Sequence, residues 1–173
     1  QIASCLVGSE MCIRDSKDPV KAAEMQYNKH VVKMILESAQ MLCTAHRYYG
    51  NEDVPYKTAH LNHPSTIWCR QNSRQYVWLY NHMIALGEEY TKRYGKEHLT
   101  ITKCKIPLMF LPPLIPCNQD FNEPPQAMPD EYKVEGDSIT AYWNYYIGDK
   151  SHIACLLYTS PSPRDKRQSR MAA

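Results

Sequence analysis

A ridge of polar side chains recurs at helical spacing early in the sequence and carries the residue types that amine chemistry needs. It comprises His30, Lys33, Glu37 and Gln40. Lys33 and Glu37 are four residues apart, so on a helix they meet as an ion pair worth about 0.2–0.5 kcal/mol. One interpretation is a solvated, paired helix face. The other is a site where a carboxylate and a basic group meet DNA, with an amine activated by a nearby cation or by desolvation.

A second cluster combines histidines with a proline. His60 and His63 enclose Leu61 and Asn62 and stand directly before Pro64. Two histidines could begin a metal site, but no third ligand stands at a diagnostic spacing, so we predict no metal. An Asn-His-Pro sequence is more typical of a loop that turns into a helix.

Two arginines follow this loop and are candidates for gripping phosphate. Arg70 and Arg74 lie one turn apart if a single helix runs through both, and both could then face a DNA backbone. With His63 they form the predicted nucleic-acid contacts of this region. Trp68 and Trp78 stand beside them, and we expect these two rings to be core residues rather than base-stacking platforms.

Aromatic residues crowd the segment 142–148, which reads YWNYYIG. Four aromatic side chains in five positions of a short helix cannot all be buried on one face. An exposed ring can stack on a base, which makes Tyr145 and Tyr146 candidate nucleic-acid contacts. The alternative is that these rings pack against the main helices.

The two ends of the sequence do not read as protein. Residues 155–165 translate a transposase adapter used in preparing sequencing libraries, and residues 6–15 translate its reverse complement. We therefore expect residues 1–16 and 155–173 to be adapter-derived rather than native. A single helical domain is expected over residues 17–154, with a proline-rich arm at 106–130. The source would be an assembled environmental read.

Composition changes when these ends are set aside. The whole chain has a net charge of +2 and 7 cysteines, whereas residues 17–154 have 15 basic and 15 acidic residues and four cysteines. No CxxC pair is present, which argues against a zinc knuckle or redox motif. Residues 17–105 carry a surplus of five positive charges and residues 106–154 a surplus of five negative ones. This polarity is compatible with binding a polyanion or with internal charge pairing.

Helix signals dominate the stretch up to residue 105. A short helix is expected at 17–26, with Asp18 as its cap and Pro19 at its first position. The clearest helix spans 30–48. Its predicted buried stripe recurs every three or four residues and comprises Val32, Ile35, Ala39, Leu42 and His46. A different face is predicted for Lys33, Glu37, Gln40, Thr44 and Arg47.

Further helices are predicted by the same signals. One runs from Pro64 or Ser65 to Arg70, and a long one capped by Ser73 ends near Tyr94, before Gly95. Shorter ones are expected at 97–104 and, capped by Asp137 or Ser138, at 139–147. Gly87 is interpreted as a close-packing point. Seven prolines in 106–129 exclude a helix there, and the apolar residues between them suggest an arm lying across the core.

The sequence thus predicts a mostly α fold, a compact orthogonal helical domain with a proline-rich extended arm. No apolar run reaches the 18–20 residues or so that a membrane-spanning helix needs. No GxGxxG, P-loop, GxSxG or HExxH motif is present, and no cofactor is expected. Four scattered thiols suit a reducing cytoplasm.

Several segments resemble a family of small marine-phage proteins. These are residues 17–42 with NHPSTIW at 62–68, EYTKRYGK at 89–96, QAMPDEYK at 126–133 and the aromatic YWNYYIG. Those phage proteins are similar to members of the pyrimidine-dimer DNA glycosylase (endonuclease V) family. The pattern shared with that family is carried by Lys29, Val32, Gln40, Met41 and Leu42, then by Asn62, His63, Pro64 and Trp68.

The resemblance implies an all-helical enzyme that engages ultraviolet-damaged DNA. In that family the N-terminal amine attacks the sugar C1′ and forms a Schiff base, a helix carboxylate assists, and arginines grip phosphates. Here Asn28, Lys29 and His30 occupy the region of the family's helix glutamate, and Glu37 is the substitute carboxylate. The helix pattern and the Asn-His-Pro element lead us to predict that Lys29, His30, Lys33 and Glu37 line the catalytic site.

The expected function is that of a pyrimidine-dimer glycosylase/AP lyase relative. Its expected partner is double-stranded DNA, and we expect a monomer, without membrane association, in the cytoplasm of a bacterial host cell as a virus-encoded protein. One alternative is a non-catalytic helical module that binds DNA or a protein, which the zero net charge of residues 17–154 favours. Another is an enzyme acting on free nucleotides.

Overall fold

A computed structural model describes residues 18–145 and 148 of the chain, with the exception of residues 25, 27 and 127. Six α-helices and one 3-10 turn make up its regular structure, and the described residues contain no strand. The helices are α1 (Pro19–Glu24), α2 (Asn28–Tyr48), α3 (Pro64–Gln71), α4 (Ser73–Tyr94), α5 (Leu99–Cys104) and α6 (Ser138–Tyr145), with the 3-10 turn at Asp130–Tyr132. The mostly helical prediction is confirmed.

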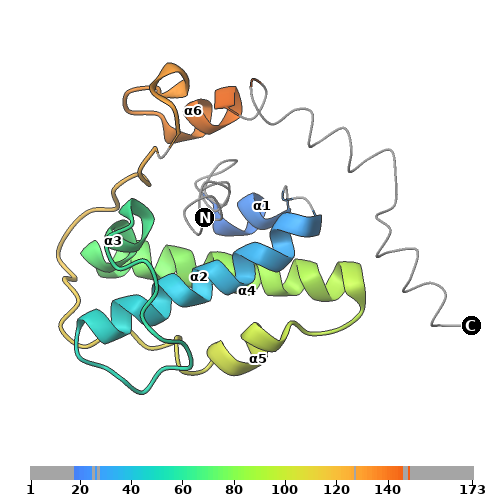
Figure 1. Cartoon of the computed structure of the whole chain (residues 1–173), viewed down its shortest axis with the longest axis vertical. Coiled ribbons are helices and arrows are strands. Elements are labelled where there is room, and N and C mark those ends of the chain that lie inside the picture. The colour runs from blue at the N-terminus through green and yellow to red at the C-terminus, as the bar shows by residue number, and fades with distance from the viewer. Residues whose placement is uncertain (1–17, 25, 27, 127, 146–147, 149–173) are drawn as a thin grey trace, which may run out of the picture.

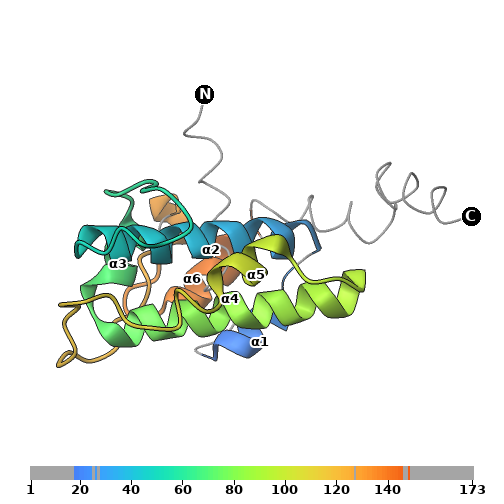
Figure 2. The same ribbon diagram turned by 90° about the horizontal axis from the view of Figure 1, so that it is seen from below.

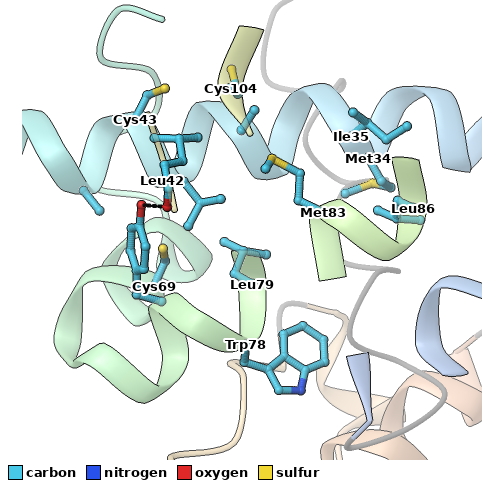
Figure 3. Packing of buried hydrophobic residues seen from close by; sticks show 14 of the residues in the cluster. Met34, Ile35, Leu42, Cys43, Cys69, Trp78, Leu79, Met83, Leu86 and Cys104 are labelled. Atoms are coloured by element: carbon cyan, nitrogen blue, oxygen red, sulfur yellow. Dashed lines mark hydrogen bonds between the residues drawn. The ribbon is translucent and has the colours of Figure 1, made fainter. Parts of the chain in front are cut away.

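The two long helices form the centre of the molecule. α2 and α4 run in opposite directions and pack along their length, while α1 and α5 flank α4 and α3 packs on α2 (Figures 1 and 2). The core between them is built of fully buried side chains, among them Met34, Ile35 and Leu42 of α2 and Leu79, Met83 and Leu86 of α4 (Figure 3). Trp68 and Trp78 are buried too, as predicted.

Residues at the helix ends explain where the helices start and stop. Asp18 accepts a hydrogen bond from the Val20 amide at 2.9 Å, as predicted for a cap. Asp137 accepts one from the Thr140 amide at 3.0 Å. Gly95 has φ +68°, and its N–H donates to the Thr91 carbonyl, which ends α4 in the expected way.

The predicted cap of α4 is wrong by one residue. Asn72, rather than Ser73, accepts from the backbone amides of Arg74 and Gln75, at 2.7 and 3.3 Å. Its backbone is extended, so it ends α3 and starts α4 at the same point. Asparagine and serine are comparable caps, so residue type alone does not decide which of two neighbouring positions starts the helix.

The buried stripe of α2 was predicted correctly at four of its five positions. Ile35, Ala39, Leu42 and His46 are buried, but Val32 is 37% exposed and its neighbour Val31 is fully buried instead. Val31 and Ile35 are also one turn apart, so periodicity does not distinguish the two valines. Thr44, predicted on the polar face, is buried because its hydroxyl exchanges hydrogen bonds with the Ala59 backbone.

Gly87 lets α5 approach α4. A Cβ at this position would stand 2.7 Å from Cγ1 of Ile101, closer than real contacts allow. The close-packing interpretation of this glycine is therefore confirmed.

Residues 106–126 and 128–129 contain neither helix nor strand, and five carbonyls between residues 105 and 122 accept hydrogen bonds from α3, α4 and the Asn72 that joins them. The Tyr80 hydroxyl donates to the Lys105 carbonyl, the Tyr76 hydroxyl to Leu108, and the Ser73 amide to Pro116. Farther along, Asn72 and Trp68 donate to the carbonyls of Asp120 and Asn122. Beyond this segment α6 and the 3-10 turn share a small apolar cluster of their own, formed by Met128, Ala141, Tyr142 and Tyr145 with Tyr132 and Val134.

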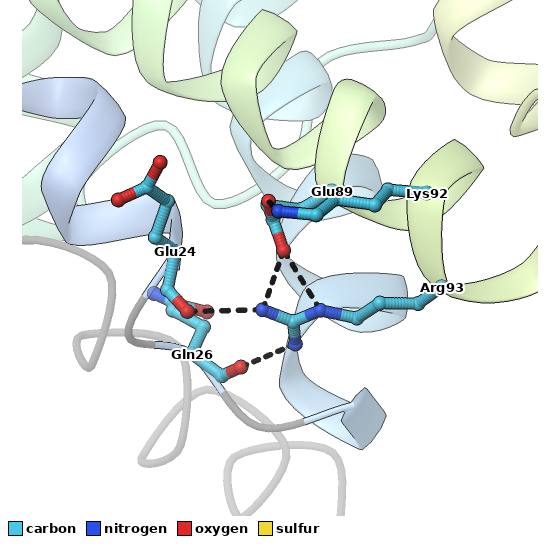
Figure 4. Close-up of polar contacts among 5 residues, drawn as sticks. All are labelled: Glu24, Gln26, Glu89, Lys92 and Arg93. Carbon is cyan, nitrogen blue, oxygen red and sulfur yellow. Dashed lines mark hydrogen bonds and ion pairs between the residues drawn. The ribbon is translucent and has the colours of Figure 1, made fainter.

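α1 is fastened to α4 by a polar clamp and by a buried histidine. Arg93 donates to the carbonyls of Glu24 and Gln26, at 3.0 and 2.5 Å, and also pairs with Glu89 (Figure 4). Three turns earlier on α4, His82 Nδ1 donates to the Pro19 carbonyl at 2.9 Å. The His82 ring is fully buried and stacks on Trp78.

Burial of His82 makes stability depend on pH. Desolvation lowers its pKa to about 4 from 6.5, even though the Pro19 carbonyl opposes the shift. The unfolded chain therefore binds the proton first, and stability that is present above pH 6.5 is lost as pH falls toward 4. We predict that the free energy of unfolding falls about 2 kcal/mol more between pH 7 and pH 5 in the parent protein than in His82→Gln. Urea titrations at the two pH values measure this. Equal losses in both proteins would contradict it.

Candidate functional site

The polar ridge of α2 brings its predicted residues onto one helix face. Spacings of three and four residues place His30, Lys33, Glu37 and Gln40 on that face, all of them half-buried. Lys33 Nζ lies 3.2 Å from Glu37 Oε1, and the Glu37 side chain is only 13% exposed. Lys29 belongs to the first turn of α2, and its side chain lies outside the described residues.

This pair is the arrangement that proton transfer to and from an amine requires. A protonated lysine becomes a nucleophile only when a base takes its proton, and the Glu37 carboxylate is in contact with it. The largely covered carboxylate lies where the local dielectric is lower than in water, which strengthens its interaction with Lys33. The same contact is also an ordinary helix ion pair, so geometry alone is compatible with both sequence interpretations.

His63 has a local structural task. It is the N-cap of α3, and its Nδ1 accepts from the Ser65 amide at 3.2 Å. Accepting at Nδ1 places the proton of the neutral ring on Nε2. Burial lowers the pKa of His63, and the neighbouring His60 lowers it further. The loop-into-helix interpretation of Asn-His-Pro is thus confirmed, since Pro64 is the first residue of α3.

Arg70 and Arg74 do not lie on one helix. Arg70 is in the last turn of α3 and Arg74 in the first turn of α4, because the extended Asn72 separates the two. Arg70 lies over the Tyr48 ring, 4.3 Å from its centroid, and donates to the Leu61 carbonyl at 2.5 Å. Arg74 is 60% exposed, with Asp120 at 3.5 Å as an exposed partner. Of the two, Arg74 is presented to solvent, whereas Arg70 is held by the protein.

Tyr145 is a core residue of the small C-terminal cluster. It is 6% exposed, and its ring centroid lies 5.3 Å from that of Tyr132. The prediction that it stacks on a base is therefore not supported, because this ring is buried. The alternative was packing against the main helices, and the ring instead packs in the separate cluster that α6 shares with the 3-10 turn. The sequence could not separate the two outcomes, because helical spacing alone does not tell which aromatic faces inward. Tyr146 lies outside the described residues.

A hydrogen-bonded relay through His46 escaped the sequence analysis. The Tyr76 hydroxyl donates to the Leu108 carbonyl, so it accepts from His46 Nε2 at 2.8 Å. His46 Nδ1 then accepts from the Asn51 amide at 3.0 Å. Burial lowers the pKa of His46. With both ring nitrogens engaged, this neutral histidine is a structural link rather than a general base. No sequence pattern connects residues 46, 51, 76 and 108.

His46 and Asn51 of the relay line an open hollow of about 500 Å³, together with Asp53. Its other walls are mainly apolar and include Val54, Pro55, Ile106, Phe110 and Leu111. Among the described residues no group of three His, Cys, Asp or Glu side chains could hold a metal ion. Over the same part of the chain, no helix is long and apolar enough to cross a membrane.

Comparison of the chain with protein-family models, with curated proteins and with solved structures finds no match.

The different settings of the two arginines predict different costs of removal. Arg70→Ala loses the contact with Tyr48 and the bond to Leu61, and we expect the free energy of unfolding to fall by about 1–2 kcal/mol. Arg74→Ala, at an exposed position with an exposed partner, should change it by less than about 0.5 kcal/mol. Urea denaturation of both variants measures the difference. Similar costs for the two would show that Arg70 is not held in this way.

Proposed function

We propose that this chain is a DNA glycosylase/AP lyase of the pyrimidine-dimer type, acting on damaged double-stranded DNA through a Schiff base. The observation that supports it best is the Lys33–Glu37 pair, in which an amine touches a largely covered carboxylate. The resemblance of the chain to phage relatives of such enzymes supports the same reaction. A virus-encoded protein acting as a monomer in the cytoplasm of a bacterial host fits this role.

The pair has two tasks in the proposed reaction. Glu37 accepts the Lys33 proton, and the free amine attacks C1′ of the damaged nucleotide. The C1′–N bond to the base breaks with its electron pair on the base, and the sugar ring opens to leave an iminium ion on Lys33. Loss of a proton from C2′ then eliminates the 3′ phosphate, and water releases the lysine. His30 stands one turn from Lys33 and is a second group able to carry protons.

Borohydride reduction tests this directly, because it converts the iminium ion into a stable covalent link. The parent protein should be trapped on ultraviolet-irradiated duplex DNA, and the adduct should map to the peptide that contains Lys33. Lys33→Met should abolish that adduct, and Glu37→Gln should slow its formation by about 10²–10⁴-fold. Gel shift of the denatured adduct and mass spectrometry provide the measurement.

Lys92 offers a matched control. It forms an ion pair of the same 3.2 Å length with Glu89 on α4, a different helix. Lys92→Met should therefore be trapped like the parent protein. An adduct that survives Lys33→Met and maps to another amine would leave the lyase in place but remove Lys33 as its nucleophile. If the folded protein gives no adduct at all, the proposed lyase activity is wrong.

A non-catalytic helical module that binds DNA or a protein is the second candidate. The zero net charge of residues 17–154 favours it, and the Lys33–Glu37 contact is then an ordinary helix ion pair. Salt-dependent affinity for DNA without strand cleavage or trapping would establish this alternative.

A further inference from the structure

The segment that follows α5 exposes apolar side chains to an unusual degree. Residues 106–116 contain no charge. Five of their large apolar side chains are 41% to 87% exposed: Ile106, Met109, Phe110, Leu111 and Leu114. Exposed apolar groups gathered in this way mark a contact surface far more often than isolated ones do. We refer to residues 106–116 as the apolar loop.

The exposure does not come from a loosely attached chain. Leu108 and Ile115 of the apolar loop are buried in the main core. Hydrogen bonds from Tyr80 to the Lys105 carbonyl (2.9 Å), from Tyr76 to Leu108 (3.0 Å) and from the Ser73 amide to Pro116 (2.8 Å) fix its backbone along the first turns of α4. The exposed side chains are therefore presented on a fixed support.

Leu114 has a strained backbone conformation, which indicates that the rest of the structure holds its side chain in the exposed position. Its φ is +68°, in the left-handed region that a leucine adopts only at a cost of about 1–2 kcal/mol. It is also the most exposed large apolar side chain of the described residues, at 87%. Neither the strain nor the exposure benefits the isolated protein. Both are consistent with a residue that meets a partner.

Cations stand at both ends of the apolar loop. Lys103 and Lys105 precede it and are exposed, and Arg74 follows Ser73, which binds the last carbonyl of the loop. Tyr80 lies seven positions after Ser73 on α4, so the two ends lie about 10 Å apart along this helix. That distance corresponds to about three base-pair steps of a duplex. No acidic residue occurs between positions 98 and 119. Asp120 forms an exposed ion pair with Arg74, in which a DNA phosphate can take the place of the Asp120 carboxylate.

We infer that the apolar loop is a wedge for double-stranded DNA at a distorted step. Phe110 and Leu114 enter between base pairs, while Lys103 and Lys105 on one side and Arg74 on the other contact phosphates. Apolar wedges of Phe, Leu, Ile, Met or Pro unstack base steps in this way, at a cost of a few kcal/mol per step that is lower where the step is already damaged. This inference depends on DNA being the partner in the proposed function. The wedge then gives the protein its preference for distorted duplex DNA.

Charge favours DNA over a second copy of the chain. A two-fold symmetric contact through the apolar loop would bring the lysines of both copies toward each other. DNA phosphates pair with them instead. An anionic lipid surface would also pair with these lysines, and it is one of the outcomes that the experiment separates.

The test compares the parent protein with Phe110→Ala/Leu114→Gly. Glycine accepts the left-handed backbone of residue 114, and both changes lie at exposed positions, so the variant should fold. The parent should raise the fluorescence of a 2-aminopurine placed beside a mismatch and should bind that duplex about tenfold more tightly than a matched one. The variant should lose both effects while keeping the parent's affinity for the matched duplex, measured by fluorescence anisotropy at fixed salt.

Two further variants complete the design. Val20→Ala, an exposed apolar position on α1, should behave as the parent. Lys103→Gln/Lys105→Gln should weaken binding to both duplexes and lower the slope of log affinity against log salt by about 2.

Each contrary result has its own meaning. If Phe110→Ala/Leu114→Gly still prefers the mismatched duplex and still raises the 2-aminopurine fluorescence, the apolar loop is not a wedge. The proposed function would be unaffected by that result. If borohydride traps no adduct but the parent protein still prefers the mismatched duplex and the wedge variant does not, only the proposed lyase activity is wrong. Loss of binding to phosphatidylserine vesicles in the wedge variant, with DNA binding unchanged, would identify the loop as a lipid contact and overturn the inference.

Discussion

A proline-rich chain cannot form hydrogen bonds with itself in a helix, so its carbonyls need donors from elsewhere. This requirement organises one half of the molecule. Five carbonyls between residues 105 and 122 accept from five residues of the α3–α4 corner: Tyr80, Tyr76, Ser73, Asn72 and Trp68. The donors occur in reverse order along the chain, so the segment runs antiparallel to α4 and then reaches α3. The surface presented by the apolar loop depends on these bonds.

The α2 ridge depends on a different support. α2 is packed against α4 along its length, and Met34, Ile35 and Leu42 anchor it in the core. The opposing polar face is then held in a fixed orientation, with Lys33 and Glu37 in contact. A rigid helix is a better base for such a pair than a loop, because it keeps donor and acceptor aligned without further ordering. The proposed chemistry and the proposed wedge therefore rest on separate parts of one framework.

Local signals predicted the elements well and the tertiary contacts poorly. Asp18, Asp137 and Gly95 act at helix ends through neighbours in the chain, and each was found from sequence. The choice between Val31 and Val32 depends on which helix covers α2, and that is a tertiary fact. The same holds for Tyr145, whose burial depends on Tyr132, and for the relay of His46 and Tyr76. The sequence predicted one helix up to Arg70 and another from Ser73, but it left open whether a single helix runs through Arg70 and Arg74. The extended backbone of Asn72 decides this, and it leaves no trace in hydrophobic periodicity.

Asn72 has a consequence for the order in which the chain can fold. One amide side chain caps α4 through its oxygen and holds the Asp120 carbonyl through its nitrogen, 48 residues away in sequence. The α3–α4 corner is a local structure that closes early, whereas the second bond requires a long loop to close first. When the oxygen of the Asn72 amide caps α4, its N–H₂ group points away from the helix and can donate to the Asp120 carbonyl. We therefore expect the proline-rich segment to dock on this corner late in folding, and opening of the first turn of α4 to break the Asn72–Asp120 bond as well.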